Sequence, residues 1–325
     1  MCCDNTLYFS SNGHLGLGGL DVFYSKNVDG KWSNVRNVGI PVNSGADDFA
    51  FMIKGDDGYI SSNRSGGLGK DDIYAIKKIM PLCDILLESA AQIKPGVTTG
   101  EVDSYAADLM KRNDCKSAFL GYKQRNGPAF PGNVCISVND EIVHGIGGPR
   151  IIQPGDIIKL DVGIIKNGWV GDNALTVPVG DVGHEVEKLL LATEESLHIA
   201  ISFAREGVML GDLCASVEKH VRTKGFTVVR EFVGHGVGKN LHEAPQIPNY
   251  RPETNRPKLR KGMILAIEPM VNMGNAGIKM LDDDWTVVTA DGKQSAHFEH
   301  TVLITDGEPE ILTWRERTMM AGSTA

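Results

Sequence analysis

Four carboxylates and one histidine occupy positions where the surrounding residues predict buried strands or tight turns. They are Asp161, Asp172, His235, Glu268 and Glu299. Carboxylates are unfavourable in strands, and burying one is costly unless it is paired or binds a cation. Oxygen ligands with an imidazole suit Mn²⁺, Fe²⁺, Co²⁺ or Zn²⁺, and two such ions about 3.5–4 Å apart can activate a shared water molecule. The set therefore predicts the metal centre of a two-metal hydrolase.

A predicted β-hairpin brings the first two carboxylates together. Asn167-Gly168 is a two-residue turn signal between strands expected at 157–165 and 169–177. If this turn sets the register, residue 163 faces Asp172, and Asp161 faces residue 174. The two carboxylates are then diagonal neighbours on one face, about 7–8 Å apart at the backbone. Two aspartates alone in such an arrangement more often form a solvent-exposed acidic face. The other three candidate ligands, however, favour the metal site.

The elements that must position these residues alternate between helix pairs and groups of strands. Apolar periodicity and the Thr98–Glu101 capping box predict the helices, which lie at 81–93, from residue 98 onward, 184–204 and 212–224. Further strands are expected at 134–138, 226–232, 263–267, 284–289 and 296–304. This order predicts an α+β fold with two similar halves.

Residues 1–77 differ in composition from the rest, being rich in Gly, Ser, Asn and Asp, and contain an internal repeat with an offset of 51 residues. Tyr8-Phe9-Ser10-Ser11-Asn12, Gly16-Leu17-Gly18 and Asp21-Val22-Phe23 reappear as Tyr59-Ile60-Ser61-Ser62-Asn63, Gly67-Leu68-Gly69 and Asp72-Ile73-Tyr74. The pattern resembles the WD40-like repeats of bacterial envelope proteins, which implies an incomplete β-propeller blade. Propellers need about 4–8 blades, so we expect a truncated remnant or an artefactual gene fusion, with a small independent β domain as the alternative. The expected domains are 1–77 and 78–325.

Composition limits the remaining classes. The chain has 325 residues, of which 42% are hydrophobic and 23% are charged, and its net charge of −8 argues against nucleic acid as the main partner. No apolar run reaches the roughly 18 residues of a membrane helix, and Met1-Cys2-Cys3-Asp4 does not resemble a secretory signal. The six cysteines are scattered without a CxxC pair, which favours reduced thiols. We therefore expect a cytoplasmic protein with no membrane partner.

Residues 79 to about 315 resemble the type I methionine aminopeptidases. The resemblance rests on motifs that occur in order along the chain: Lys94-Pro95-Gly96-Val97-Thr98-Thr99-Gly100-Glu101, Cys135-Ile136-Ser137-Val138-Asn139-Asp140-Glu141-Ile142-Val143-His144-Gly145-Ile146, Lys159-Leu160-Asp161-Val162-Gly163, Gly234-His235-Gly236-Val237-Gly238 with His242-Glu243-Ala244-Pro245, Ile267-Glu268-Pro269-Met270, Asp284-Trp285-Thr286-Val287 and Phe298-Glu299-His300-Thr301. It implies the pita-bread fold and removal of the initiator methionine from nascent chains. Methionyl peptides are the implied substrates, the ribosome is a candidate partner, and a monomer is expected.

The resemblance also implies a role for each site residue. Asp161 would bind one of the two divalent ions, Asp172 and Glu299 would bridge both, and His235 and Glu268 would complete the second site. Glu268 would also carry the proton of the activated water.

The remaining roles concern the substrate. His144 and His242 would bind the substrate amide and stabilise the tetrahedral intermediate. The methionine side chain would be surrounded by Tyr122, Phe130, Cys135 and Trp285.

Some positions depart from the family pattern. Phe130-Pro131-Gly132-Asn133 stands where Tyr-Pro-x-Ser is usual, and extra residues fall within Lys123–Ala129, both at the rim of the methionine pocket. Gly147-Gly148 replaces a usual proline, Asn173-Ala174 replaces Thr-Ser, and His297 stands where glutamine is common.

Three other functions compete with this one. An Xaa-Pro aminopeptidase or prolidase shares the fold and metals but usually carries a larger upstream domain. A non-catalytic pita-bread binding protein would have lost metal residues, whereas all five remain here. An envelope binding module built on the propeller-like residues 1–77 would need export.

Overall fold

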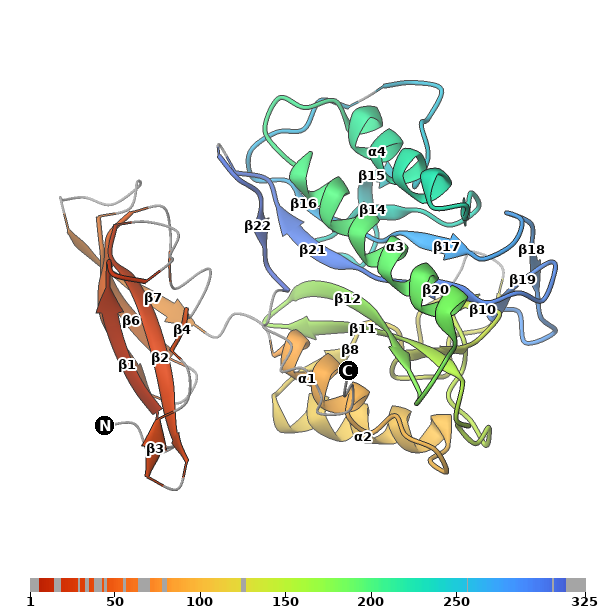
Figure 1. Ribbon diagram of the computed structural model, residues 1–325, viewed down its shortest axis with the longest axis horizontal. Helices are drawn as coiled ribbons and strands as arrows, with labels where there is room; N and C mark the ends of the chain where they lie inside the picture. The colour runs from red at the N-terminus through yellow and green to blue at the C-terminus, as the bar shows by residue number, and fades with distance from the viewer. Residues whose placement is uncertain are drawn as a thin grey trace. The chain divides into compact units, whose positions relative to one another are not determined.

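The computed structural model describes residues 6–14, 19–28, 30–32, 35–37, 43, 46–54, 57–63, 71–77, 81–123, 127–255, 257–305 and 307–313. The chain divides into two compact units, Met1–Ile79 and Met80–Ala325 (Figure 1). The two units are described separately below.

The first unit contains two small antiparallel sheets. The first sheet contains β1 (Thr6–Ser11), β2 (Asp21–Val28), β3 (Lys31–Trp32) and β4 (Arg36–Asn37), and the second contains β5 (Asp48–Lys54), β6 (Asp57–Ser62) and β7 (Asp72–Lys77). Ser11 faces Asp21 in the β1–β2 pair, and Ser62 faces Asp72 in the β6–β7 pair. The two copies of the repeat therefore form the same hairpin in the same register. Both Gly-Leu-Gly motifs lie outside the described residues.

The first half of the second unit packs two helices against a sheet. It contains α1 (Leu82–Ala90), α2 (Thr99–Arg112), β8 (Lys116–Ser117), β9 (Cys135–Val138), β10 (Glu141–Val143), β11 (Ile157–Lys166) and β12 (Trp169–Pro178). Helix α2 begins at the predicted capping box, because Thr98 Oγ1 accepts from the Glu101 amide and Glu101 Oε2 accepts from the Thr98 amide. In the sheet, β12 and β9 both pair with β11, and β8 pairs with its far end.

The β11–β12 hairpin has the register that its turn signal predicts. Gly163 faces Asp172, and Asp161 faces Ala174. Residues 161 and 172 therefore project from the same face, as expected for a side-chain period of two. Asn167 and Gly168 have φ angles of 53° and 76°, as a type I′ turn requires.

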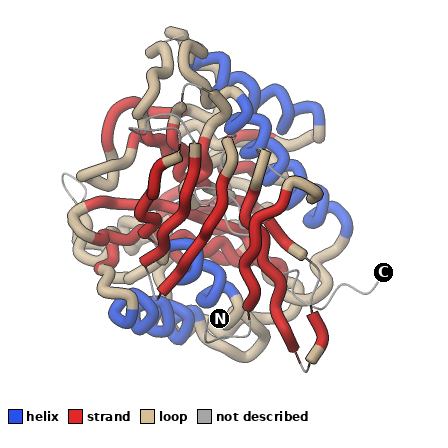
Figure 2. The backbone as a smooth tube through the Cα atoms, turned by 90° about the vertical axis from the view of Figure 1, so that its left-hand side faces the viewer, coloured by secondary structure: helices blue, strands red, loops and turns tan. Residues whose placement is uncertain are grey.

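The second half repeats the order of a helix pair followed by strands. It contains α3 (His184–Ser202), α4 (Leu210–Thr223), β13 (Thr227–Val228), β14 (Gly234–Gly236), β15 (Glu243–Ile247), β16 (Ile264–Ile267), β17 (Met270–Asn272), β18 (Ile278–Met280), β19 (Val287–Thr289), β20 (Ser295–His297), β21 (His300–Leu303) and β22 (Glu310–Ile311). The largest sheet has the order β15-β14-β16-β21-β22. Helix α1 lies beside α2, and α3 lies beside α4 (Figure 2).

Hydrogen bonds join the two halves along β12. The Thr301 hydroxyl donates to the Asp172 carbonyl at 2.6 Å, and the Glu299 amide donates to the Ala174 carbonyl at 2.9 Å. One apolar core also runs through both halves, from Leu82 on α1 to Val302 on β21. The strands that carry the candidate ligands are thus held together by backbone bonding and by shared packing.

Three predicted strands are shorter or broken in the structure. The segment 226–232 is a strand only at Thr227–Val228. The strand expected at 284–289 begins at Val287, because the Asp283 side chain accepts from the amides of residues 285 and 286 and holds them in a turn. The segment 296–304 is split into β20 and β21, because it changes partner from β17 to β16 at residues 298–299.

In the described residues, no helix combines the length and apolar character needed to cross a membrane.

Candidate active site

One cavity of about 220 Å³ brings all eleven predicted site residues together. It is lined by Tyr122, Phe130, Cys135, His144, Asp161, Asp172, His235, His242, Glu268, Trp285 and Glu299. These residues are separated by up to 177 positions in the sequence, so only the packing of the two halves makes them neighbours.

Both halves supply the five candidate metal ligands. Asp161 and Asp172 come from the β11–β12 hairpin, and His235 comes from β14. Glu268 directly follows β16, and Glu299 lies between β20 and β21. Both glutamates are therefore placed where a strand ends or changes its partner, which frees their side chains from ordinary sheet packing.

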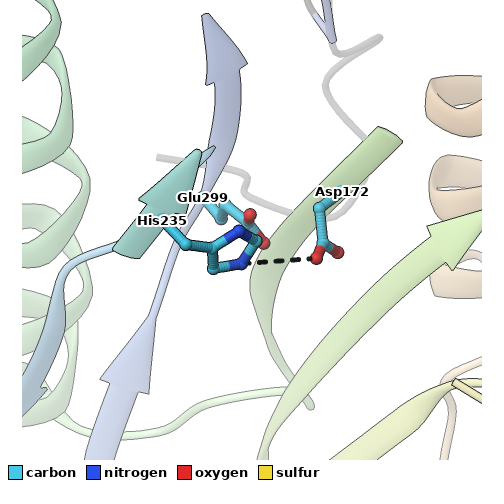
Figure 3. A group of neighbouring side chains, drawn as sticks. All are labelled: Asp172, His235 and Glu299. Carbon is cyan, nitrogen blue, oxygen red and sulfur yellow. Dashed lines mark ion pairs between the residues drawn. The ribbon is translucent and has the colours of Figure 1, made fainter. Parts of the chain in front are cut away.

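Three of these ligands are close enough to share one ion. Ligand atoms of Asp172, His235 and Glu299 all lie within 4.8 Å of one another (Figure 3). His235 Nε2 is 3.8 Å from Asp172 Oδ2 and 3.5 Å from Glu268 Oε1. Asp161 lines the same cavity as these ligands.

The backbone fixes the ring of His235 in a form suited to metal binding. His235 Nδ1 is 3.0 Å from the Gly236 carbonyl, which can only accept a hydrogen bond. The proton must therefore lie on Nδ1, and Nε2 has a free lone pair that faces the carboxylates. A metal-binding histidine is commonly oriented in this way.

The carboxylates are electrostatically unfavourable without a cation. Burial raises the pKa of Asp161 well above its ordinary value, and the charges of Asp172 and Glu268 raise it further. Burial also raises the pKa of Asp172 to about 7, and burial together with neighbouring carboxylates raises the pKa of Glu268 and Glu299 well above their ordinary values. Such a cluster is expected where positive charge is to be bound.

Unpaired oxygens support the same conclusion. Asp161 Oδ1, Asp172 Oδ1 and Glu299 Oε1 are buried and have no hydrogen-bond partner in the described part of the chain. Native proteins rarely leave buried polar atoms unpaired. The donor set of four carboxylates and one lone-pair imidazole fits divalent transition ions.

His144 is held in an unusual backbone conformation. Its φ angle is 60°, in the left-handed region that disfavours residues with a side chain. Burial, followed by the charge of His242, lowers the pKa of His144 to about 4, so the ring is neutral near pH 7. Its Nδ1 is buried and has no hydrogen-bond partner among the described residues, and the ring packs edge-on against Phe232 and Trp285.

His242 is hydrogen-bonded to another predicted site residue. Its Nδ1 lies 2.7 Å from the Tyr122 hydroxyl, across 120 positions of sequence. Tyr122 is itself held by backbone bonds, since its amide donates to the Phe119 carbonyl and its carbonyl accepts from the Phe130 amide. Lys123 forms a β-bridge with Ala129, so the extra residues at 123–129 extend from Tyr122 as a loop that is closed at its base. Residues 124–126 lie outside the described part of the chain.

An apolar cluster forms one wall of the cavity. Phe119, Phe130, Leu241 and Trp285 pack together with Cys135, and the rings of Phe130 and Trp285 meet edge-on with centroids 5.2 Å apart. Burial raises the pKa of the Cys135 thiol well above its ordinary value, and the nearby carboxylates raise it further. Cys135 is therefore a protonated wall residue and not a thiolate nucleophile.

The structure explains two of the departures by hydrogen bonding to α2. Asp103 accepts hydrogen bonds from the Asn133 amide, the Asn133 side chain and the Val134 amide, so Asn133 anchors the segment that leads to Cys135. The Gly148 amide donates to Thr99 Oγ1 at 2.9 Å, which holds this segment close to α2. A Cβ at Gly147, the position of the usual proline, would lie only 2.9 Å from Asp103 Cβ, so this close approach leaves little room for a side chain there.

Several residues of the site were not predicted from the sequence. Phe119, Val143, Phe232, Val233, Leu241 and Met270 also line the cavity. Phe232 and Val233 immediately precede the Gly234-His235 motif, which is a weak signal that could have pointed to them. The sequence shows no comparable signal for Phe119.

The cysteines remain thiols in the described part of the chain. Cys83, Cys115, Cys135 and Cys214 are buried and free, as predicted, and Cys2 and Cys3 lie outside the described residues.

Comparisons with known proteins agree with this geometry. Residues 74–306 match the model of metallopeptidase family M24. Methionine aminopeptidase 1 of Bacillus subtilis is 49% identical over 226 residues, which cover 70% of this chain and 89% of that protein. The crystal structure of methionine aminopeptidase from Thermotoga maritima superposes with a TM-score of 0.68 at 42% identity, covering 72% of this chain and 92% of that one.

A more distant structure shares the fold alone. The prolidase from Pyrococcus furiosus superposes with a TM-score of 0.57 at 24% identity, covering 73% of this chain and 62% of that one. The observed halves are thus those of the pita-bread fold. With a family match over most of its length and a ligand set suited to divalent ions, this chain belongs to metallopeptidase family M24.

Proposed function

We propose that the cavity residues carry out the removal of an N-terminal methionine by hydrolysis of the first peptide bond. The chain is a metal-dependent hydrolase of the methionine aminopeptidase type, acting on methionyl peptides. The observation that carries the proposal is the meeting of five candidate ligands, of which Asp172, His235 and Glu299 are buried, with an apolar pocket in one cavity.

The five ligands would hold two divalent ions. Asp161 would bind one ion, Asp172 and Glu299 would bridge the pair, and His235 with Glu268 would bind the other. Such ions, when bound, would acidify a water molecule and polarise the scissile carbonyl. The buried oxygens of Asp161, Asp172 and Glu299, which have no hydrogen-bond partner among the described residues, support cation binding at these three residues.

Glu268 would move the proton. Its carboxylate lies at the edge of the ligand group, 3.5 Å from His235 Nε2, and its side chain keeps 13% exposure to the cavity. A carboxylate oxygen would accept a proton from the attacking water and return it to the leaving amine nitrogen.

The two neutral histidines would orient the peptide. His144 lies beside the apolar wall, and its buried Nδ1 has no hydrogen-bond partner in the part of the chain that the structure describes. The ring centroid of His242 lies 4.4 Å from that of His235. Both can hydrogen-bond to the scissile amide without adding charge, and a donor to the developing oxyanion stabilises the transition state.

The apolar wall would select methionine. Phe130, Trp285, Tyr122 and Cys135 line the same cavity as the ligand group and form its apolar wall. A thioether side chain makes favourable contacts with the edges of aromatic rings. The free α-amine of the substrate would then lie beside the carboxylates. Because this position requires a free N-terminus, the enzyme would act as an exopeptidase.

Glu268→Gln tests the mechanism. The variant keeps the size of the side chain and one ligand oxygen but loses the basic oxygen. We expect kcat on a methionyl peptide to fall by about 10²–10⁴, with little change in KM and at least one metal retained. Glu187→Gln, on the exposed surface of α3, is the matched control. Near wild-type turnover by metal-loaded Glu268→Gln would show that another group carries the proton.

The Xaa-Pro alternative is tested with the same protein. Methionyl and Xaa-Pro peptides are compared at equal concentrations, and cleavage of the methionyl peptide alone is expected. Preference for Xaa-Pro peptides would refute the assignment of the pocket.

Residues 1–77 remain a predicted propeller-type segment. The equal register of its two hairpins supports a true structural repeat. We also propose a cytoplasmic monomer that meets nascent chains at the ribosome. Gel filtration and co-sedimentation with ribosomes test these two points.

A further inference from the structure

The Glu268 carboxylate lies between two imidazoles. Its Oε1 is 3.5 Å from His235 Nε2, and its Oε2 is 3.4 Å from His297 Nε2. His235 is a proposed metal ligand, whereas His297 has no role in the mechanism described above. The two carboxylate oxygens of Glu268 therefore have different environments.

His297 is rigidly placed. The residue is 1% exposed, and its backbone is held by Thr176, whose hydroxyl accepts from the His297 amide at 3.0 Å and donates to the His297 carbonyl at 2.7 Å. In the β17–β20 pair, His297 faces Met270, and Met270 follows Glu268 by two positions in the sequence. The sheet thus directs the ring toward this carboxylate and leaves it little freedom to move.

The described residues offer the His297 ring nitrogen Nε2 no other hydrogen-bond partner. His297 Nε2 is buried and forms no hydrogen bond of good geometry in the described part of the chain. A buried unpaired donor is costly, and 3.4 Å is only a few tenths of an ångström beyond an ordinary N–H···O separation. Catalytic hydrogen bonds are often long before substrate binds and shorten afterwards.

We propose that His297 is a positioning residue whose Nε2–H donates to Glu268 Oε2 and turns the carboxylate so that Oε1 faces the cation site beside His235. The inference rests on the proposed role of Glu268. It assigns to His297 no contact with substrate or metal. Partners of this kind orient metal-binding side chains, and their loss typically weakens metal binding or activity about 10- to 100-fold.

The position also shows which side chains could replace the imidazole. Glutamine, the residue common in the resembling family, carries an N–H donor on a side chain of similar reach. Leucine fills a similar volume but cannot donate. Asparagine can donate but is one methylene shorter than glutamine, so it should not reach Glu268 Oε2. The three substitutions therefore distinguish a need for a hydrogen-bond donor that reaches Glu268 Oε2 from a need for a side chain that only fills the volume of the imidazole.

The test compares His297→Gln, His297→Leu and His297→Asn with the wild-type full chain. His220→Leu, on α4 and bonded to Glu195 away from the cavity, is the matched control. Thermal unfolding of each protein shows whether it is folded. The first readout is calorimetric titration of chelator-treated protein with Mn²⁺ alone. The second is kcat and KM on a methionyl peptide with Mn²⁺ at saturation.

The leucine and asparagine variants should bind the more weakly held Mn²⁺ about 10- to 100-fold less tightly, and kcat should fall by a similar factor while KM stays within about twofold. The glutamine variant should remain within about threefold of wild type in both measurements. If His297→Leu binds Mn²⁺ and turns over like wild type, or if His297→Gln is as impaired as His297→Leu, the proposal is overturned. If His297→Leu fails to fold, His297→Asn against His297→Gln decides the question.

The Mn²⁺ titration keeps the inference separate from the proposed function. If no protein cleaves methionyl peptides, yet the leucine and asparagine variants lose Mn²⁺ affinity and glutamine restores it, the proposed function fails and the role of His297 stands. If cleavage is normal in wild type and Mn²⁺ binding is equal in all four proteins, the role of His297 fails and the function stands.

Discussion

Replacing His144 separates the cost of its backbone conformation from the function of its ring. The residue has a φ angle of 60°, a conformation that glycine adopts freely and alanine does not. His144→Gly and His144→Ala both remove the ring, so the terms for lost packing and for the unpaired Nδ1 nearly cancel between them. What remains is the strain of one Cβ in the left-handed region.

The size of the difference follows from that strain. A left-handed residue with a side chain is less stable than glycine by roughly 1–2 kcal/mol. The lower chain entropy of unfolded alanine offsets part of this, since glycine is otherwise less stable than alanine by roughly 0.5–1 kcal/mol. We therefore expect His144→Gly to be more stable than His144→Ala by about 1 kcal/mol, or about 2–4 °C in Tm for a unit of this size.

The assay is calorimetric and urea unfolding of both variants with saturating metal, together with kcat on a methionyl peptide. Lys219, exposed within α4, provides the opposite control, because there Lys219→Ala should be more stable than Lys219→Gly by about 1 kcal/mol. Both His144 variants should bind metal and lose activity to a similar degree. If His144→Ala equals or exceeds His144→Gly in stability, the left-handed conformation is not strained and the reasoning is wrong.

Three further outcomes follow. A chain lacking residues 1–77 should keep its Tm and its kcat/KM, because the site and its core lie within Met80–Ala325; failure to fold would show that the first unit completes the second. In metal-free protein, the pKa of Asp172 is raised to about 7, so the folded state binds its proton more tightly than the unfolded state. The free energy of unfolding is compared with that of metal-free Asp172→Asn at each pH. The difference should fall by up to about 1.4 kcal/mol per pH unit between pH 5 and 7 and level off above pH 7. A difference that does not change with pH would contradict the raised pKa. Thr98→Ala should lower the free energy of unfolding by about 1 kcal/mol in urea titrations through loss of the α2 cap, whereas Thr223→Ala near the end of α4 should change it by less.

Features that depend on a few neighbouring residues could be predicted from the sequence. The Asn167-Gly168 turn predicted the register that pairs Gly163 with Asp172, and Thr98 with Glu101 predicted where α2 begins. Each rests on local hydrogen bonds and backbone preferences, which hold in nearly any surroundings. The candidate ligands were found for a related reason, since a carboxylate within an apolar strand is conspicuous.

Other features were decided only by the packing of the two halves. The contact of Tyr122 with His242 spans 120 positions, and the bond between Thr301 and Asp172 spans 129. The strain at His144 and the closeness of His297 to Glu268 likewise depend on segments that meet only in the folded chain. A one-dimensional pattern records which residues are available, but the distances between remote side chains, and hence their pKa values and hydrogen bonds, exist only once the shared core has brought the two halves together.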